Sequence, residues 1–288
     1  MGTKDITEKY LGAYNDVFAD IVNVLLFQGK RIVRPESLEP DGCKTVYKAD
    51  GKPHEQERDI AKIWKEQNVK IALLGLENQT AVDPYMPFRA IGYDGASYRA
   101  QLLDGGEKYP VATIVLYFGT DKRWNGAKKL SDCFTITDDL KPYVNDYKIN
   151  VFEIAFMEEE QVQQFTSDFR IVADYFVQKR KDKDYRPKRE TIKHVDAVLK
   201  LMATLTNDSR FEEIQVKEGD DITMCDVLDR IEEKGRLEGR QEGRLEGQLE
   251  GKAQLIKNAL EAGVSKADVK KILKVTESEI AEAEKLMK

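Results

Sequence analysis

Apolar residues along this chain follow two patterns, short continuous runs and helical spacings. The runs at 69–76, 111–118 and 149–156 are rich in β-branched residues, which is typical of buried strands. Apolar residues recur three and four positions apart over 5–29 and 158–180, which predicts amphipathic helices. This order of strands and helices predicts an α/β or α+β architecture, with a mixed sheet flanked by helices.

Further helices are expected after the first of these strands and towards the C-terminus. Asp83 followed by Pro84 is typical of a helix start, because Asp caps the free N–H groups and Pro suits the first helical position. This helix would run to about Leu103. Helical spacing returns at 190–206 and 221–234. Helices therefore both precede and follow the strands.

The strand at 69–76 leads directly into the polar residues Glu77, Asn78 and Gln79. Side chains alternate along a strand, so Glu77 and Gln79 share one face and Asn78 takes the other. Burying a carboxylate is costly unless a cation or hydrogen bonds compensate it. The pattern therefore predicts either a candidate metal site or a strand that ends in a polar loop.

A second acid approaches Glu77 if the preceding segment is also extended. Residues 57–64 fit either a helix or a distorted strand. A turn at Gln67-Asn68 would pair this segment with the following strand as an irregular hairpin. Asp59 would then lie close to Glu77.

Several other charged positions have both an ordinary and a functional interpretation. Asp16, Asp20 and Asn23 follow one edge of the first predicted helix, either as a solvated rim or as residues that face a cation. Arg89 forms either an ordinary ion pair or a phosphate contact near Glu77, since a short connection brings its helix beside the strand end.

Residues 179–193 carry eight basic and three acidic side chains. Such a segment is either a solvated linker or a place where a phosphate backbone docks. Lys188 and Arg189 are our candidates for contact with DNA.

Composition narrows the class of protein. Charged residues make up 34% of the chain and the net charge is −6, which excludes a uniformly cationic nucleic-acid binder. The three cysteines are far apart and there are two histidines, which argues against a disulfide framework and against a thiolate or histidine-rich metal site. Without an apolar run of membrane-spanning length or a signal peptide, we expect no membrane association and a cytoplasmic protein.

Residues 235–251 form a strict tetrad repeat, with Gly at every fourth position and Glu three residues after each Gly but the last. A period of four nearly matches a helical turn, but each Gly costs about 1 kcal/mol relative to Ala and like charges stack one turn apart. The repeat is therefore either a flexible spacer or a helix that self-associates, its Glu column facing the Arg column of another copy. Residues 253–288 predict three short helices, arranged as a helix-turn-helix or as a packing module.

Four motifs together resemble the Rpn family of recombination-promoting nucleases, also called putative transposases, of the PD-(D/E)XK nuclease superfamily. The motifs are ERDI at 57–60, GLENQT at 75–80, VDPYMPFR at 82–89 and Tyr93-Asp94. The likeness covers residues 10 to about 180, and the repeat and helical tail are also similar to the ends of many members.

The resemblance implies a restriction-endonuclease-like α/β core, a mixed sheet flanked by helices, with a helical C-terminal extension. The corresponding divisions are a nuclease-like domain at 1–180, a basic linker and helical segment at 181–234, the tetrad repeat at 235–252 and a small helical tail at 253–288.

The resemblance also implies metal-dependent cleavage of DNA. Asp59 and Glu77 match the acidic motif residues that bind Mg²⁺, with Mn²⁺ as an alternative, and the backbone carbonyl of Asn78 is a further ligand. Gln79 stands where the superfamily usually has a lysine that holds the attacking water and offsets negative charge. Asp20 is our choice for the acidic residue of the first helix.

Two functions from different classes follow. The first is a metal-dependent DNA endonuclease in recombination or mobile-element biology. The second is a nuclease-like fold of little activity that serves as a DNA-binding or oligomeric assembly module. The intact Asp59/Glu77 pair favours the first, whereas the uncharged Gln79 and the acidic net charge favour the second.

Overall fold

A computed structural model of the 288-residue chain describes residues 11–41, 45–49, 52–56, 59–67, 69–182, 185, 187–216 and 221–285. The chain forms two compact units, Met1–Val227 and Leu228–Lys288. None of the helices formed by these described residues is long and apolar enough to cross a membrane.

The first unit is built on a five-stranded mixed sheet in the order β1-β4-β5-β6-β7. The strands β1, β4 and β5 are antiparallel, and β6 and β7 continue the sheet in parallel with β5. A separate antiparallel pair is formed by β2 and β3. The bounds are β1 (Leu38–Pro40), β2 (Thr45–Ala49), β3 (Lys52–Gln56), β4 (Ile60–Glu66), β5 (Val69–Gln79), β6 (Val111–Tyr117) and β7 (Asn150–Glu153).

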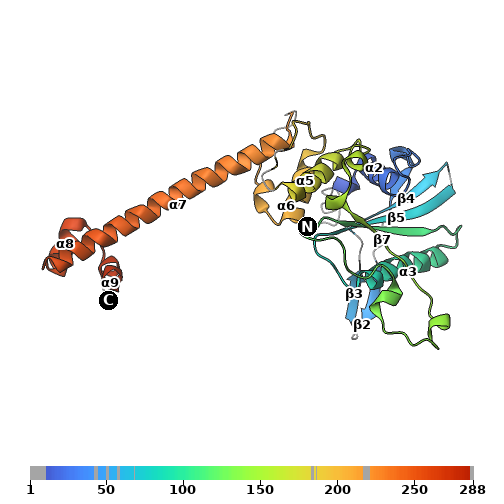
Figure 1. Ribbon diagram of the computed structural model, residues 1–288, viewed down its shortest axis with the longest axis horizontal. Helices are drawn as coiled ribbons and strands as arrows, with labels where there is room; N and C mark the ends of the chain where they lie inside the picture. Colours follow the sequence, from blue (N-terminus) through green and yellow to red (C-terminus); the bar gives the residue numbers. More distant parts are fainter. Residues whose placement is uncertain are drawn as a thin grey trace. The chain divides into compact units, whose positions relative to one another are not determined.

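Helices cover both faces of this sheet, as Figure 1 shows, with α2 and α5 on one face and α3 on the other. The α-helices of this unit are α2 (Asn15–Leu25), α3 (Met86–Asp104), α4 (Glu159–Val162), α5 (Phe169–Lys181) and α6 (Val195–Thr206). Short 3₁₀ helices are η1 (Leu11–Ala13), η2 (Pro35–Ser37), η3 (Leu130–Cys133), η4 (Lys141–Tyr143), η5 (Ile154–Phe156) and η6 (Ser209–Phe211). The expected α/β fold, a mixed sheet flanked by helices, is confirmed.

The two faces of the sheet bury different clusters. Towards α3, the buried Met86, Ala90 and Tyr93 pack with Val115 and Tyr117 of β6. On the face of α2 and α5, the aromatic side chains Phe118, Phe165, Phe169 and Phe176 contact one another. Since β5 and β6 lie between these clusters, both of their faces are buried, as their apolar runs predict.

The segment at 57–64, for which helix and strand were both open, is extended from Ile60. It pairs antiparallel with β5, and the register shifts between Trp64 and Lys65, so the expected irregular hairpin is confirmed. Positions 57 and 58 lie outside the described residues.

The first predicted helix is shorter than its apolar pattern indicated. Its expected beginning, 5–10, lies outside the described residues, and η1 precedes an α-helix that starts only at Asn15. Tyr14 has an extended backbone, with φ −73° and ψ 129°, which separates the two. Gly12 allows a close approach here, because a Cβ atom on it would lie 2.5 Å from Cδ1 of Ile60.

The single helix predicted at 158–180 is wrong, since α4 and α5 are separated by six residues. The break arises because the backbone N–H groups of Thr166 and Ser167 donate to the carboxylate of Asp20, each at 2.8 Å, and not to carbonyls of their own helix. The strand expected at 149–156 is also shorter, and its last residues form η5.

The tetrad repeat is helical. It lies within α7 (Met224–Glu261), a single helix that does not end at 234 as predicted and that includes the first of the three expected tail helices. The remaining two are α8 (Lys266–Leu273) and α9 (Glu277–Lys285) (Figure 1). A small apolar cluster joins the end of α7 to them, formed by Ile256, Val269, Val275 and Ile280.

Candidate metal centre at the end of β5

Near the end of β5, the side chain of Glu77 lies on the face of the sheet that α3 covers. Glu77 is the neighbour of Val115 in the parallel pair of β5 and β6, and Val115 packs against α3. Neighbouring residues in such a pair share a face. The glutamate is 1% exposed, so its carboxylate is surrounded by protein.

Two residues of α3, one turn apart, meet this carboxylate. Arg89 donates from Nη2 to Oε1 of Glu77 and from Nη1 to Oδ2 of Asp83, the latter at 3.2 Å. The hydroxyl of Tyr93 and the side-chain amide of Gln79 also donate to Oε1, both at 3.4 Å. The other oxygen, Oε2, is buried and has no hydrogen-bond partner within the described part of the chain.

Asp59 lies beside Glu77, directly before the neighbouring strand β4. The register of β4 and β5 pairs Ile60 with Leu76, so the next positions along the two strands are adjacent. Oδ2 of Asp59 accepts a hydrogen bond of 2.7 Å from the backbone N–H of Asn78. The proximity of the two acids anticipated from the hairpin is therefore present.

Burial shifts both acids towards the protonated form, and repulsion from Asp59 adds to the shift of Glu77. Burial, and then repulsion from Asp59, raises the pKa of Glu77 to about 7, although Arg89 opposes the shift. Although Asp59 is exposed as a residue, partial withdrawal of its carboxyl from water raises its pKa too. A cation between two such carboxylates would offset both effects.

The donor set fits Mg²⁺, because the buried Oε2 of Glu77 has no hydrogen-bond partner among the described residues and a second carboxylate, that of Asp59, is adjacent. No group of three or more His, Cys, Asp or Glu side chains suited to a metal ion occurs among the described residues. Mg²⁺ typically uses one or two carboxylates together with waters and phosphate oxygens. Two acids at the end of a strand match this mode of coordination, which leaves room for water and phosphate, better than they match a closed structural metal site.

Asp20 makes its contacts with a different set of residues. It is 2% exposed and accepts hydrogen bonds from Arg31, Thr166 and Ser167, whereas the donors to Glu77 described above are Gln79, Arg89 and Tyr93. Its assignment to the metal site remains a prediction.

The other two residues on that edge of α2 also have protein partners. Asp16 binds Nζ of Lys193 at 2.5 Å and Nε2 of His194 at 3.2 Å. Asn23 holds the backbone of Ile32 and Val33.

Lys188 and Arg189 are both exposed, in the segment that joins α5 to α6. Glu77 faces α3 instead, so the structure does not gather these two basic residues with the acidic pair. Their role in DNA contact stays a prediction.

Tyr93 and Asp83 belong to this site, although sequence patterns assigned neither a role there. The available signal was spacing, because Tyr93 stands one helical turn after Arg89 and therefore shares its face. Asp83 combines two tasks, since Oδ1 accepts from the N–H of Tyr85 at 2.8 Å while Oδ2 binds Arg89.

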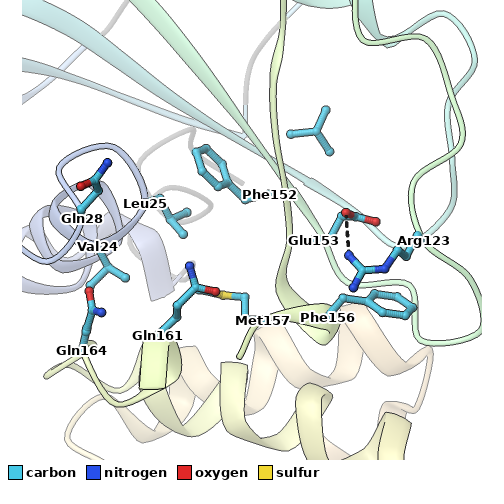
Figure 2. Close-up of a pocket in the computed structure, with 11 residues that line it drawn as sticks. Val24, Leu25, Gln28, Arg123, Phe152, Glu153, Phe156, Met157, Gln161 and Gln164 are labelled. Carbon is cyan, nitrogen blue, oxygen red and sulfur yellow. Dashed lines mark hydrogen bonds and ion pairs between the residues drawn. The ribbon is translucent and has the colours of Figure 1, made fainter. Parts of the chain in front are cut away.

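A separate pocket of about 260 Å³ lies near the end of β7. Figure 2 shows Arg123 and Glu153 paired on one side of it, with Val24, Phe152 and Gln161 among the other lining residues. None of the candidate site residues lines this pocket. The acidic pair Asp59 and Glu77 therefore does not lie in this pocket.

A protein-family model described as "Putative transposase, YhgA-like" matches residues 64–210, just over half of the 288 residues. The chain belongs to the YhgA-like putative transposase family. No curated protein and no solved structure matches it.

The extent of the YhgA-like match bears on the candidate site. It includes Glu77, Gln79 and Arg89, and also the basic segment, but it begins after Asp59. The family resemblance expected from the motifs is confirmed at this level, and membership of the PD-(D/E)XK superfamily stays a prediction.

Proposed function

We propose that this YhgA-like family member is a Mg²⁺-dependent DNA endonuclease that hydrolyses phosphodiester bonds. The observation that carries the proposal is the buried Glu77, whose Oε2 lacks a partner among the described residues and whose neighbour is a second acid, Asp59. The transposase description of the family supports a role in DNA processing. The widely spaced cysteines suit action in the reducing cytoplasm.

Each residue of the site has a distinct task in this proposal. Asp59 and Glu77 hold the ion, together with the backbone carbonyl of Asn78. When bound, Mg²⁺ polarises a phosphoryl oxygen and lowers the pKa of a bound water; Mn²⁺ can replace it. Gln79 shares the face of Glu77 and orients water through its amide, although it cannot offset negative charge as a lysine would.

Arg89 contributes through its charge and its number of donors. Its guanidinium compensates Glu77 and Asp83 at the start of α3, and its side chain is 39% exposed. A guanidinium has five N–H donors, so Arg89 can keep one acid and bind a phosphate oxygen with the rest. Lys188 and Arg189 bind backbone phosphates further from the reacting bond.

The test is nicking of supercoiled plasmid by the full chain with Mg²⁺ or Mn²⁺. We expect Glu77→Ala and Asp59→Asn to lower the nicking rate by about 100-fold or more, because each removes charge that stabilises the transition state through the metal. Glu107→Gln is the matched control, since it removes an exposed acid outside the site. Nicking that persists unchanged in Glu77→Ala would refute the assignment.

A second candidate function is favoured by one observation, the direct pairing of Arg89 with Glu77. This ion pair already compensates the carboxylate and competes with a metal, and Gln79 adds no charge. The chain would then act as a DNA-binding or homo-oligomeric assembly module through the basic segment and the tetrad repeat. DNA binding by the unmutated protein without nicking in either metal would favour this function over the first.

A further inference from the structure

Three aromatic side chains are exposed together at the start of α3. Tyr85 is 60% exposed, Phe88 42% and Phe134 48%. The ring centroids of Tyr85 and Phe88 lie 6.0 Å apart, and those of Phe88 and Phe134 lie 5.3 Å apart. We call these three residues the aromatic platform. Large aromatic side chains gathered on a surface mark an interaction site more often than isolated ones do.

The platform is held in place by the beginning of α3 and by η3. The N–H of Tyr85 donates to Asp83, and the thiol of Cys133, next to Phe134, contacts the carbonyl of Pro84 at 3.7 Å. Met86, between the rings in sequence, is fully buried in the core. The rings therefore project from a fixed base.

The platform is continuous with the candidate metal centre. Asp83 binds the backbone of Tyr85 through one oxygen and Arg89 through the other, and Arg89 binds Glu77. Phe88 directly precedes Arg89 in the chain. A DNA strand with one phosphate at Glu77 and Arg89 would thus place its neighbouring bases beside the exposed rings.

We propose that the aromatic platform stacks unpaired bases next to the scissile phosphate, so that the substrate class is single-stranded or locally unpaired DNA. This inference rests on the proposed nuclease function. Bases inside a duplex are already stacked on each other, whereas every unpaired base has a free aromatic face. Stacking of this kind does not depend on base identity, so the platform selects the state of the strand and not its sequence.

A protein partner is the competing occupant of an exposed aromatic surface. Stable protein interfaces use about 20–30 residues a side, whereas the platform consists of three rings beside a guanidinium. Aromatic faces next to a cation are the combination that single-strand binding surfaces use. These features favour an unpaired nucleic-acid strand.

The test measures binding of the full chain to a fluorescent single-stranded oligonucleotide and to the matched duplex, with EDTA present so that cleavage is not required. We expect Phe88→Ala and Phe134→Ala each to weaken single-strand binding by roughly 10-fold, in line with the loss of one stacked base. Binding to the duplex should stay the same. Plasmid nicking, measured separately, should be faster on supercoiled than on relaxed DNA.

Three further variants separate stacking from other effects. Phe134→Trp keeps a ring and should retain binding, whereas Phe134→Leu keeps an apolar side chain without a ring and should lose it. Tyr143→Ala removes a side chain that is 82% exposed in η4 and serves as the control. Equal single-strand binding by Phe134→Leu and the unmutated protein would overturn the proposal. A change in the sedimentation of the platform variants with no change in their DNA binding would also overturn it.

The outcomes also distinguish this proposal from the nuclease function. Loss of nicking in Glu77→Ala together with unchanged single-strand binding in Phe134→Ala would overturn the platform alone. Ring-dependent binding without nicking by the unmutated protein would overturn the nuclease function and leave the platform as a single-strand binding surface.

Discussion

At the scale of single residues, Glu77 couples the stability of the fold to pH. Its pKa is raised from 4.5 to about 7, mainly by burial and then by Asp59. The folded state therefore binds this proton more tightly than the unfolded chain. The stabilisation is fully present below about pH 4.5 and is lost as the pH rises through about 7. We expect the unfolding free energy of the unmutated protein to fall by an amount on the order of 3 kcal/mol across this pH range. Glu77→Gln should remove this fall. Urea unfolding without metal at about pH 5 and about pH 8 measures it.

The control for this prediction is Glu107→Gln, which should follow the unmutated protein at every pH because Glu107 is exposed. Mg²⁺ at about pH 8 should stabilise the unmutated protein and leave Glu77→Gln unchanged, since a ligand that binds the folded state raises its stability. Parallel pH curves for Glu77→Gln and the unmutated protein would contradict the burial of an ionisable carboxyl at this position.

Sequence patterns predicted the acidic pair and the approach of Arg89 to Glu77, but not the contacts of Tyr93 and Asp83. Strand alternation placed Glu77 and Gln79 on one face, and the hairpin brought Asp59 close. The short connection after β5 placed Arg89 near Glu77, but the hydrogen bond from Tyr93 could not be predicted, because it depends on how α3 packs against β6. Such packing is a tertiary property, and a local period does not encode which side chains meet across two elements.

At the scale of elements, the loop between α4 and α5 depends on a single buried acid. Asp20 accepts the backbone N–H groups of Thr166 and Ser167 and binds Arg31. We expect Asp20→Ala to destabilise the fold by about 3 kcal/mol, because it leaves buried donors without an acceptor. Chemical denaturation checks this value. A matched control is Asp138→Ala, which removes an acid that is 93% exposed; equal stability of the two variants would contradict a structural role for Asp20.

Contacts between residues far apart in sequence explain why the boundaries of elements were predicted less well than their types. The apolar spacing over 158–180 is that of one helix, but the chain leaves the helical path where Asp20, far away in sequence, supplies better acceptors for two N–H groups. Likewise, the first helix starts late because Gly12 packs against Ile60 on β4. In both cases a remote contact overrides the local pattern. The runs at 69–76 and 111–118 form β5 and β6 at close to their predicted bounds, since both strands are buried on both faces. The run at 149–156 forms the shorter, half-buried β7.

At the scale of the whole molecule, the contacts within one copy of the chain do not explain the tetrad repeat in α7. Leu237, Leu245 and Leu249 are 46%, 58% and 54% exposed. A Cβ atom added at Gly239 or Gly243 would meet nothing within 4 Å. Each repeat glycine also costs about 1 kcal/mol of helix stability. A second copy that pairs its Arg column with this Glu column would compensate that cost, and we expect the repeat to mediate homo-oligomerisation.

Charge reversal tests this pairing in the intact chain. Arg240→Glu combined with Arg244→Glu places like charges opposite each other, so we expect a smaller species in analytical sedimentation, as for a chain that ends at Lys234. Gly239→Ala is the control, because it keeps both charge columns, raises helix propensity and meets no neighbouring atom in one copy. Screening weakens contacts between exposed charges, so high salt should also shift the unmutated protein towards the smaller species. If the chain ending at Lys234 sediments as the same oligomer as the full protein, the helix of the repeat is only a spacer.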